Sequence, residues 1–193
     1  YQHAHSLALR GDVAEALETL AEADAVCALL TDPHAHARGM LSASLVNFCA
    51  MRMARASECE RQARDAMTAL GRPWEAIDLA YISVAAALHH GRLQEAAALI
   101  DDIEPRAERI GHRNAQWPLR FCRPLLHYLT GDLACAEREF RSVVAFARVH
   151  HIGWGYQSEL GLGENLFLQG KTDEALDIVR RVAAFEPPSR DKQ

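Results

Sequence analysis

Histidines recur in close pairs along this chain and are its most obvious candidates for metal chemistry. The pairs are His3 and His5, His34 and His36, His89 and His90, and His150 and His151. Two metal ligands on one helix normally lie three or four residues apart, because only those spacings share a helix face. The spacings here are one and two, so these pairs do not predict a metal site. We expect no metal and no other cofactor.

Motifs for catalysis are also missing from the sequence. No glycine-rich phosphate loop of the type G-x-x-x-x-G-K-[ST] occurs. The run GYQSELGLG lacks the G-x-S-x-G elbow of a nucleophilic serine. Carboxylates such as Asp101, Asp102, Glu58 and Glu60 are expected near turns or on solvated faces, where nothing prepares them for proton transfer. We therefore expect no enzyme, with a site assembled from residues distant in sequence as the alternative.

Composition and charge bound the remaining classes. The chain has 193 residues, 49% of them hydrophobic and 24% charged, with a net charge of −5. Without a basic stripe we expect no nucleic-acid binding, and no apolar run reaches the roughly 18 residues of a membrane helix. The chain begins at Tyr1 without a leader, which suggests part of a longer protein. The cysteines are odd in number and lack metal-type spacing, which predicts buried thiols in a reducing cytoplasm: Cys27, Cys49, Cys59, Cys122 and Cys135.

A recurring five-residue pattern indicates the elements that must position any site. A Gly followed by a polar residue precedes an Ala by five positions, and one degenerate copy runs from Ala54-Arg55 to Cys59. The first residues of successive copies lie 43, 37, 40 and 39 residues apart. A fixed period of this length is typical of stacked helix pairs. The regular copies are Gly11-Asp12 to Ala16, Gly91-Arg92 to Ala96, Gly131-Asp132 to Ala136, and Gly170-Lys171 to Ala175.

Apolar periodicity predicts helices between these turns and no strands. Pro105 is expected to interrupt or bend one of them, because proline removes a backbone donor. The predicted domain is a single all-α solenoid over residues 1–186, and residues 187–193 form a polar tail. The expected helices cover residues 14–30, 35–53, 57–70, 73–90, 93–110, 116–130, 133–151, 155–169 and 172–185.

Small residues are expected where two helices of a pair approach closely, and larger ones fill the layer beside them. The small residues are Ala16, Cys59, Ala96, Ala136 and Ala175. Four positions later come Leu20, Ala63, Ile100, Phe140 and Val179. Three positions further come Ala23, Ala66, Ile103, Val143 and Val182.

These residues resemble the tetratricopeptide repeat (TPR). The best copy is LGLGENLFLQGKTDEALDIVRRVAAFEP, and LTGDLACAEREF and LRGDVAEALETL match its turn and second helix. The resemblance implies a right-handed superhelical solenoid of about five antiparallel helix pairs. The long period, with the helix ends ALGRPWEAIDLA and ERIGHRNAQWPLRF, is similar to the divergent repeats of bacterial LuxR-type ATP-dependent regulators and some class III nucleotide cyclases. That resemblance implies binding of partners, inducers or other domains of the same protein.

If the repeat geometry holds, the first helix of each pair lines a concave groove that binds a partner. Such an apolar, aromatic groove suits an amphipathic helix, an extended peptide or a small inducer. The alternative for each residue is ordinary packing between neighbouring repeats. The groove residues are expected to be Leu41, Ser44, Phe48, Met51, Arg52, Asp78, Tyr81, Leu88, His89, Phe121, Leu125, Tyr128, Gln157, Leu160, Glu164 and Phe167.

Two functions follow from such a groove. The first is a protein-interaction scaffold in a cytoplasmic signalling or transcription-regulatory protein, and the second is a sensor whose curvature changes when a small inducer binds. A deep pocket would favour the sensor and an open channel the scaffold. Self-association through the ends of the solenoid is a further expectation. Trp74, Trp117 and Trp154 are either interface anchors or inter-repeat packing residues.

Overall fold

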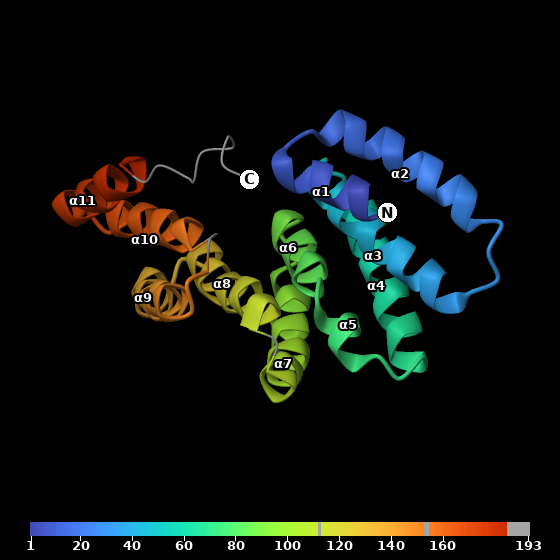
Figure 1. Cartoon of the computed structure of the whole chain (residues 1–193). Helices are drawn as coiled ribbons and strands as arrows, with labels where there is room; N and C mark the ends of the chain where they lie inside the picture. The colour runs from blue at the N-terminus through green and yellow to red at the C-terminus, as the bar shows by residue number, and fades with distance from the viewer. Residues whose placement is uncertain (112, 153–154, 185–193) are drawn as a thin grey trace. The chain divides into compact units, whose positions relative to one another are not determined.

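The computed structural model describes residues 1–111, 113–152 and 155–184, and in these residues it contains eleven α-helices and no strand (Figure 1). The predicted all-α class is thereby confirmed. The chain divides into two compact units, Tyr1–Leu119 (unit 1) and Arg120–Gln193 (unit 2). Trp154, Phe185 and the predicted tail 187–193 lie outside the described residues.

The helices form five consecutive pairs, as predicted. Within unit 1 each second helix packs against its own first helix, and within unit 2 α10 contacts both α9 and α11. The unit boundary falls inside α8. The pairs are α1 (Gln2–Arg10) with α2 (Val13–Cys27), α3 (Pro33–Cys49) with α4 (Met53–Ala69), α5 (Pro73–Ile77) and α6 (Tyr81–His89) with α7 (Leu93–Ile110), α8 (Arg113–Leu129) with α9 (Leu133–Val149), and α10 (Tyr156–Leu168) with α11 (Thr172–Ala183).

The turn inside each pair has a residue with positive φ, and these residues correct the sequence register. They are Gly11, Met51, Gly91, Gly131 and Gly170, at spacings of 40, 40, 40 and 39. The predicted degenerate copy at Ala54-Arg55 is therefore wrong by three residues, because Met51 occupies the turn with φ 57°. Ala56, five residues after Met51, is fully buried, as are the alanines five residues after Gly91 and Gly131.

The turns that link successive pairs follow the same period. Gly71, Gly111 and His151 have positive φ and lie 40 residues apart. Both turn series therefore give a 40-residue repeat unit, and a left-handed residue follows the helix at each of these eight turns. The link between α2 and α3 is the exception, because α2 ends at Ala28 in the right-handed helical region. Two of the eight positions hold a non-glycine residue, and neither could be recognised from a search for glycine.

Met51→Gly is expected to raise the free energy of unfolding by about 0.5–1 kcal/mol. A non-glycine residue in the left-handed conformation costs about 1–2 kcal/mol, which the substitution removes. Glycine also makes the unfolded chain more flexible, and this entropy offsets part of the gain in stability. Urea unfolding of the full chain measures the change. Ala50→Gly is the matched control, since its φ of −79° needs no glycine, and it should lower stability. Equal effects of the two substitutions would contradict strain at Met51.

The layer of small and large residues is largely as predicted. The five small residues are all buried, and Leu20, Ile100 and Phe140 fill the layer four positions after their alanines. Val179 is wrong, because its side chain is 49% exposed and Ile178 fills the layer instead. The corrected register of the second pair places Glu60 at the position of Leu20, Ile100 and Phe140. Glu60 is fully buried, so its predicted solvated position is wrong.

Three further differences concern the helices themselves. The predicted helix 73–90 is interrupted, because the amides of Asp78, Ala80 and Ile82 bond to carbonyls only three residues earlier. The helix α7 runs through Pro105 without interruption. The segment before Gly11, for which the sequence left open whether it completes a first hairpin, forms α1 and packs on α2 and α3.

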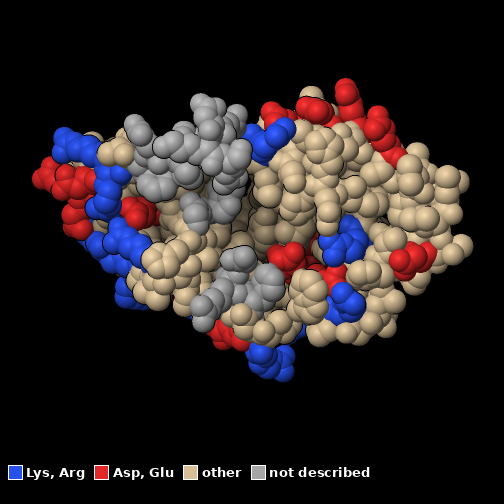
Figure 2. All heavy atoms as spheres, in the orientation of Figure 1, with Lys and Arg blue, Asp and Glu red and all other residues tan. Residues whose placement is uncertain are grey.

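Charge is distributed unevenly over the helices. The sequence of α2 contains four acidic residues and no Lys or Arg, and Figure 2 shows the acidic side chains along its outer edge. Among the described residues, no helix combines the length and apolar character needed to cross a lipid bilayer.

Candidate functional site

Neighbouring first helices in unit 2, α8 and α10, carry all seven predicted groove residues of that unit at spacings of one helix face. On α8, Phe121, Leu125 and Tyr128 follow each other at four and three residues, which is the spacing of one helix face. Gln157, Leu160, Glu164 and Phe167 follow the same rule on α10. We call these seven residues the α8–α10 stripe.

A hydrogen bond joins the two helices in the middle of this stripe. The Tyr128 hydroxyl donates to Glu164 Oε1 at 2.8 Å, across 36 residues of sequence. This bond, with partial burial and the nearby carboxylate charge, raises the pKa of Tyr128 above its ordinary value. The phenol therefore stays protonated at neutral pH and fixes the position of the carboxylate.

The two sides of the stripe differ in what they leave available to a partner. On α10, Phe167 is 60% exposed and Leu160 is 41% exposed. On α8, Phe121 and Leu125 are partly buried and pack against the core cluster of unit 2, and the Phe121 ring centroid lies 6.0 Å from that of Phe140. The α10 residues therefore supply accessible apolar surface, whereas Phe121 and Leu125 of α8 mainly pack on the core of unit 2.

The predicted groove residues of unit 1 are mostly engaged in packing. Phe48 of α3 and Tyr81 of α6 form an edge-to-face pair with centroids 5.7 Å apart, beside Leu45 and Ile82. Leu41 packs in another core cluster. Ser44 is fully buried, and its hydroxyl donates to the carbonyl of Leu41 at 2.8 Å.

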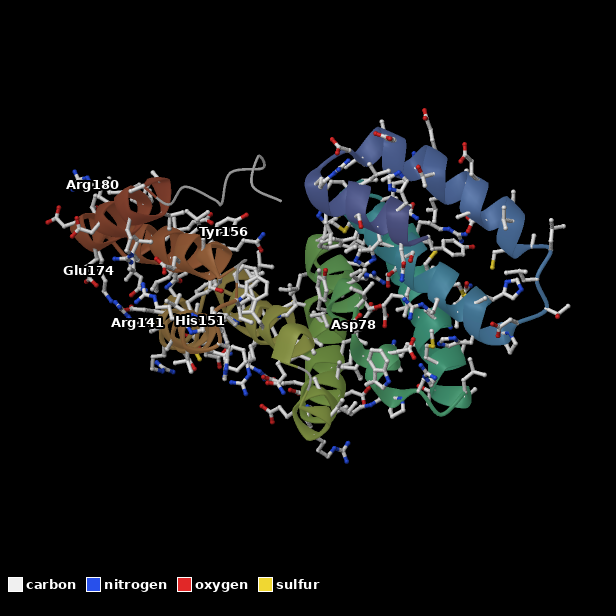
Figure 3. The ribbon with its side chains drawn as sticks, viewed as in Figure 1. Asp78, Arg141, His151, Tyr156, Glu174 and Arg180 are labelled. Carbon is white, nitrogen blue, oxygen red and sulfur yellow. The ribbon has the colours of Figure 1, made fainter. Side chains whose placement is uncertain are left out.

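Other predicted groove positions of unit 1 lie outside the middle of a first helix. Met51 and Arg52 follow the end of α3, in the turn before α4, so their predicted place in a first helix is wrong. Asp78 lies between α5 and α6 (Figure 3). Leu88 is buried, and His89 is exposed in the last turn of α6 with its ring against that of His90.

The tryptophans fall into different environments. Trp74 is 44% exposed on α5, whereas Trp117 is buried on α8. An anchor must be accessible, so the interface role fits Trp74 better than Trp117.

Residues of α9, α10 and α11 line an open surface hollow of about 370 Å³, which the sequence patterns did not predict. Glu159 accepts hydrogen bonds from Arg148 at 2.8 Å and from Arg181 at 3.0 Å. Burial alone would raise the pKa of Glu159, but these two bonds outweigh it and lower the pKa. Arg141 and Glu174 pair across the rim at 3.0 Å (Figure 3). Opposite charges in the hollow are thus already paired with each other.

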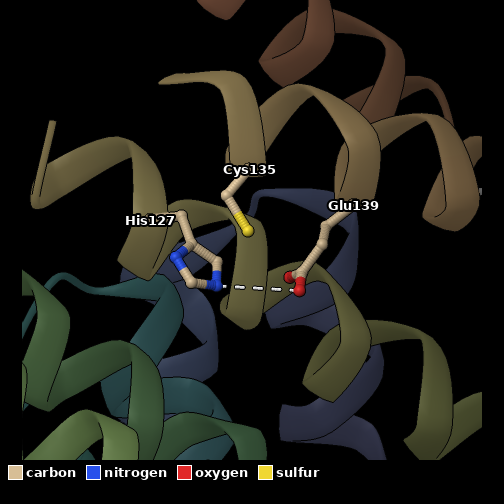
Figure 4. A group of neighbouring side chains, drawn as sticks. All are labelled: His127, Cys135 and Glu139. Atoms are coloured by element: carbon tan, nitrogen blue, oxygen red, sulfur yellow. Dashed lines mark ion pairs between the residues drawn. The ribbon is translucent and has the colours of Figure 1, made fainter. Parts of the chain in front are cut away.

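Three potential metal ligands meet where α8 ends and α9 begins. His127, Cys135 and Glu139 bring their ligand atoms within 4.8 Å of one another (Figure 4). The His127 Nε2 atom lies 3.6 Å from Glu139 Oε1. The close histidine pairs and the cysteine spacings gave no sign of this group, but the i, i+4 spacing of Cys135 and Glu139 was a usable signal.

Comparison with known proteins finds similarity in structure only. No protein-family model matches the chain, and no curated protein is significantly similar to it. Among solved structures, a Rap protein complexed with competence and sporulation factor is 15% identical with a TM-score of 0.86 over 94% of this chain. The chain spans 51% of that Rap protein.

Two further structures agree with this fold. The apo form of RapI is 9% identical, with a TM-score of 0.74, over 94% of this chain and 67% of its own. The TPR-like repeats of a putative kinesin light chain from Podosopora anserina are 18% identical, with a TM-score of 0.60, over 95% and 93% of the two chains. At these identities the similarity establishes the fold alone, a TPR-like helical repeat.

Proposed function

We propose that this chain is a non-catalytic interaction module that binds a peptide or protein segment along the α8–α10 stripe. The observation that carries the proposal is the accessible apolar surface of Leu160 and Phe167 on either side of the Tyr128–Glu164 bond. Leu160 and Phe167 are seven residues apart, which is about 10 Å along a helix. A partner helix with apolar side chains at i, i+3 or i+4, and i+7 matches that distance.

The geometry of unit 2 supports a scaffold more than a small-molecule sensor. The hollow between α9, α10 and α11 is open, and its carboxylates and guanidinium groups pair with one another. A buried small-molecule site normally encloses its ligand with a few convergent polar groups. The sensor remains the alternative that the experiment below distinguishes.

The wider context is also a proposal. We infer that residues 1–186 act as one repeat domain, since the turn period continues from Gly11 to Gly170. We place this domain in a longer cytoplasmic signalling or transcription-regulatory protein, of the LuxR-type or cyclase-associated kind that the sequence resembles. The Rap protein of similar fold, which is complexed with competence and sporulation factor, offers a parallel for a fold of this kind with a bound partner.

The double substitution Leu160→Ala/Phe167→Ala should weaken partner binding at least tenfold, because truncating an interface hot spot typically costs about 2 kcal/mol or more. A photo-crosslinking amino acid at position 167, in cells that express the parent protein, captures the partner. Its crosslinked segment is then synthesised and titrated against the wild-type and variant chains. Both side chains are exposed, so far-UV circular dichroism should be unchanged.

Leu176→Ala/Val179→Ala is the matched control, since both residues are exposed apolar positions on α11 of the same unit. This control should leave the titration unchanged, and a crosslinker at position 179 should not capture the same segment. Native mass spectrometry of the chain purified from its host adds a separate test. A stoichiometric small-molecule adduct, or equal affinity of both double variants, would contradict the proposed scaffold.

A further inference from the structure

We propose that His127, Cys135 and Glu139 form a binding site for a divalent transition metal, with Zn²⁺ as the best match. The site joins the last turns of α8 to the first turns of α9 (Figure 4). Imidazole nitrogen, thiolate sulfur and carboxylate oxygen are the three kinds of ligand that Zn²⁺ takes in proteins. Three protein ligands leave one position for water, as in open zinc sites.

The geometry of the three ligand atoms is close to that of a tetrahedral site. Zinc–ligand bonds of about 2.0–2.3 Å place neighbouring ligand atoms roughly 3.3–3.8 Å apart. The His127 Nε2 and Glu139 Oε1 atoms already lie 3.6 Å apart. All three ligand atoms lie within 4.8 Å of one another, so moving the ligand atoms by about 1 Å completes the arrangement.

An unsatisfied carboxylate oxygen independently indicates a missing cation. Glu139 Oε2 is buried and has no hydrogen-bond partner among the described residues. The Glu139 side chain as a whole is 31% exposed and its Oε1 atom faces His127, but a buried carboxylate oxygen without a partner still favours a cation beside it. A bound Zn²⁺ would neutralise this carboxylate.

The backbone around the site holds the ligands in place. The Thr130 hydroxyl donates to the carbonyls of Leu126 and His127, at 3.0 Å each, and so fixes the turn that carries His127. The amide of Cys135 donates to Asp132 Oδ1 at 3.0 Å, which fixes the first turn of α9. Cys135 and Glu139 share a face of α9 because they lie four residues apart. A site whose supports are already formed needs little rearrangement to bind a metal.

Metal titration of the purified full chain, stripped with chelator, tests the proposal. Co²⁺ serves as a spectroscopic probe and is then displaced by Zn²⁺, and we expect one equivalent with thiolate-to-cobalt charge-transfer absorption. His127→Ala, Cys135→Ser and Glu139→Gln should each weaken Zn²⁺ affinity at least about 100-fold, since loss of a residue that merely supports a ligand already costs 10–100-fold. Cys135→Ser should also abolish the charge-transfer band.

Two control variants keep the result specific. Glu137→Gln removes a carboxylate of the same helix that pairs with Lys171 and Arg141. Cys49→Ser removes a half-buried thiol elsewhere in the chain. Both should bind Zn²⁺ like the wild type. Wild-type Zn²⁺ affinity in all three ligand variants would overturn the proposal. So would a charge-transfer band that disappears in Cys49→Ser but remains in Cys135→Ser. Circular dichroism verifies that each variant is folded.

Discussion

Phe140→Ala is expected to lower the free energy of unfolding by about 3–5 kcal/mol, the range for deleting a large buried aromatic side chain. Phe140 is the largest fully buried side chain of the chain's described core, and Val144, Leu162 and Leu166 share its cluster. These neighbours belong to α9 and α10, and α10 also packs against α11, which limits collapse into the space. Urea unfolding of the full chain measures the loss, and hydrogen exchange in α9 and α10 assigns it to unit 2.

The glycine opposite this ring allows a sharper test. A Cβ atom at Gly161 would lie 2.7 Å from Phe140 Cε1, closer than atoms can approach. Gly161→Ala should therefore destabilise the wild type but be tolerated beside Phe140→Leu, so the two substitutions should couple by more than 0.5 kcal/mol. Gly163→Ala is the control, because its Cβ would meet Ile178 at an ordinary 3.4 Å. Additive effects of Gly161→Ala and Phe140→Leu would refute this contact.

The repeat architecture could be predicted from the sequence because glycine adopts positive φ at the turns and alanine is buried where helices approach, at regularly spaced positions. At the turns formed by Gly11, Gly91 and Gly131 the predicted register is correct, whereas after Gly170 it holds for Ala175 but not for Val179. The error at the second pair arose because Met51 adopts the turn conformation without being glycine. The break between α5 and α6 was equally invisible, since Asp78, Leu79 and Ala80 contain neither glycine nor proline.

The candidate site was predictable only in part, for a different reason. Counting back from each turn identified residues of one helix face, and it placed Tyr128 and Glu164 in the same set before their hydrogen bond was known. The same count could not tell accessible side chains from packed ones, so Phe167 and Phe121 received equal weight. The exposure of a side chain depends on how the neighbouring helix packs. The approach of His127 on α8 to Cys135 on α9 also depends on the packing of these two helices.

Because of the register error in the second pair, the sequence did not predict that the carboxylate of Glu60 is buried. The other pairs place Leu20, Ile100 and Phe140 at this layer position, whereas the second pair buries a carboxylate. Glu60 Oε1 accepts from Arg64 Nε at 2.9 Å, and its other oxygen accepts from the Ser83 hydroxyl. Burial raises the pKa of Glu60, and the nearby Arg64 and the two hydrogen bonds only partly oppose that effect. The carboxylate is thus compensated by a single cation.

Arg64→Met should lower the free energy of unfolding at neutral pH by about 3 kcal/mol, because removing one partner of a buried pair leaves the other charge uncompensated. Met retains the apolar stem. Arg61→Met is the matched control, since Arg61 lies on the same helix and pairs with the more exposed Glu58, and it should change stability little. A loss in the control as large as that in Arg64→Met would mean that helix propensity, rather than the buried pair, is responsible.

The pH dependence of stability in these variants tests whether folding raises the pKa of Glu60. A carboxyl whose folded-state pKa is raised costs nothing while it is protonated in both states, and its cost appears as pH rises from the unfolded value to the folded one. Wild-type stability relative to Glu60→Gln should therefore fall as pH rises above about 4.5, the ordinary value for Glu. Arg64→Met should steepen that fall and extend it to higher pH, because the lost cation raises the pKa of Glu60 further. Urea unfolding between pH 4 and pH 8 measures all three, and a pH-independent difference between wild type and Glu60→Gln would show that folding does not raise the pKa of Glu60.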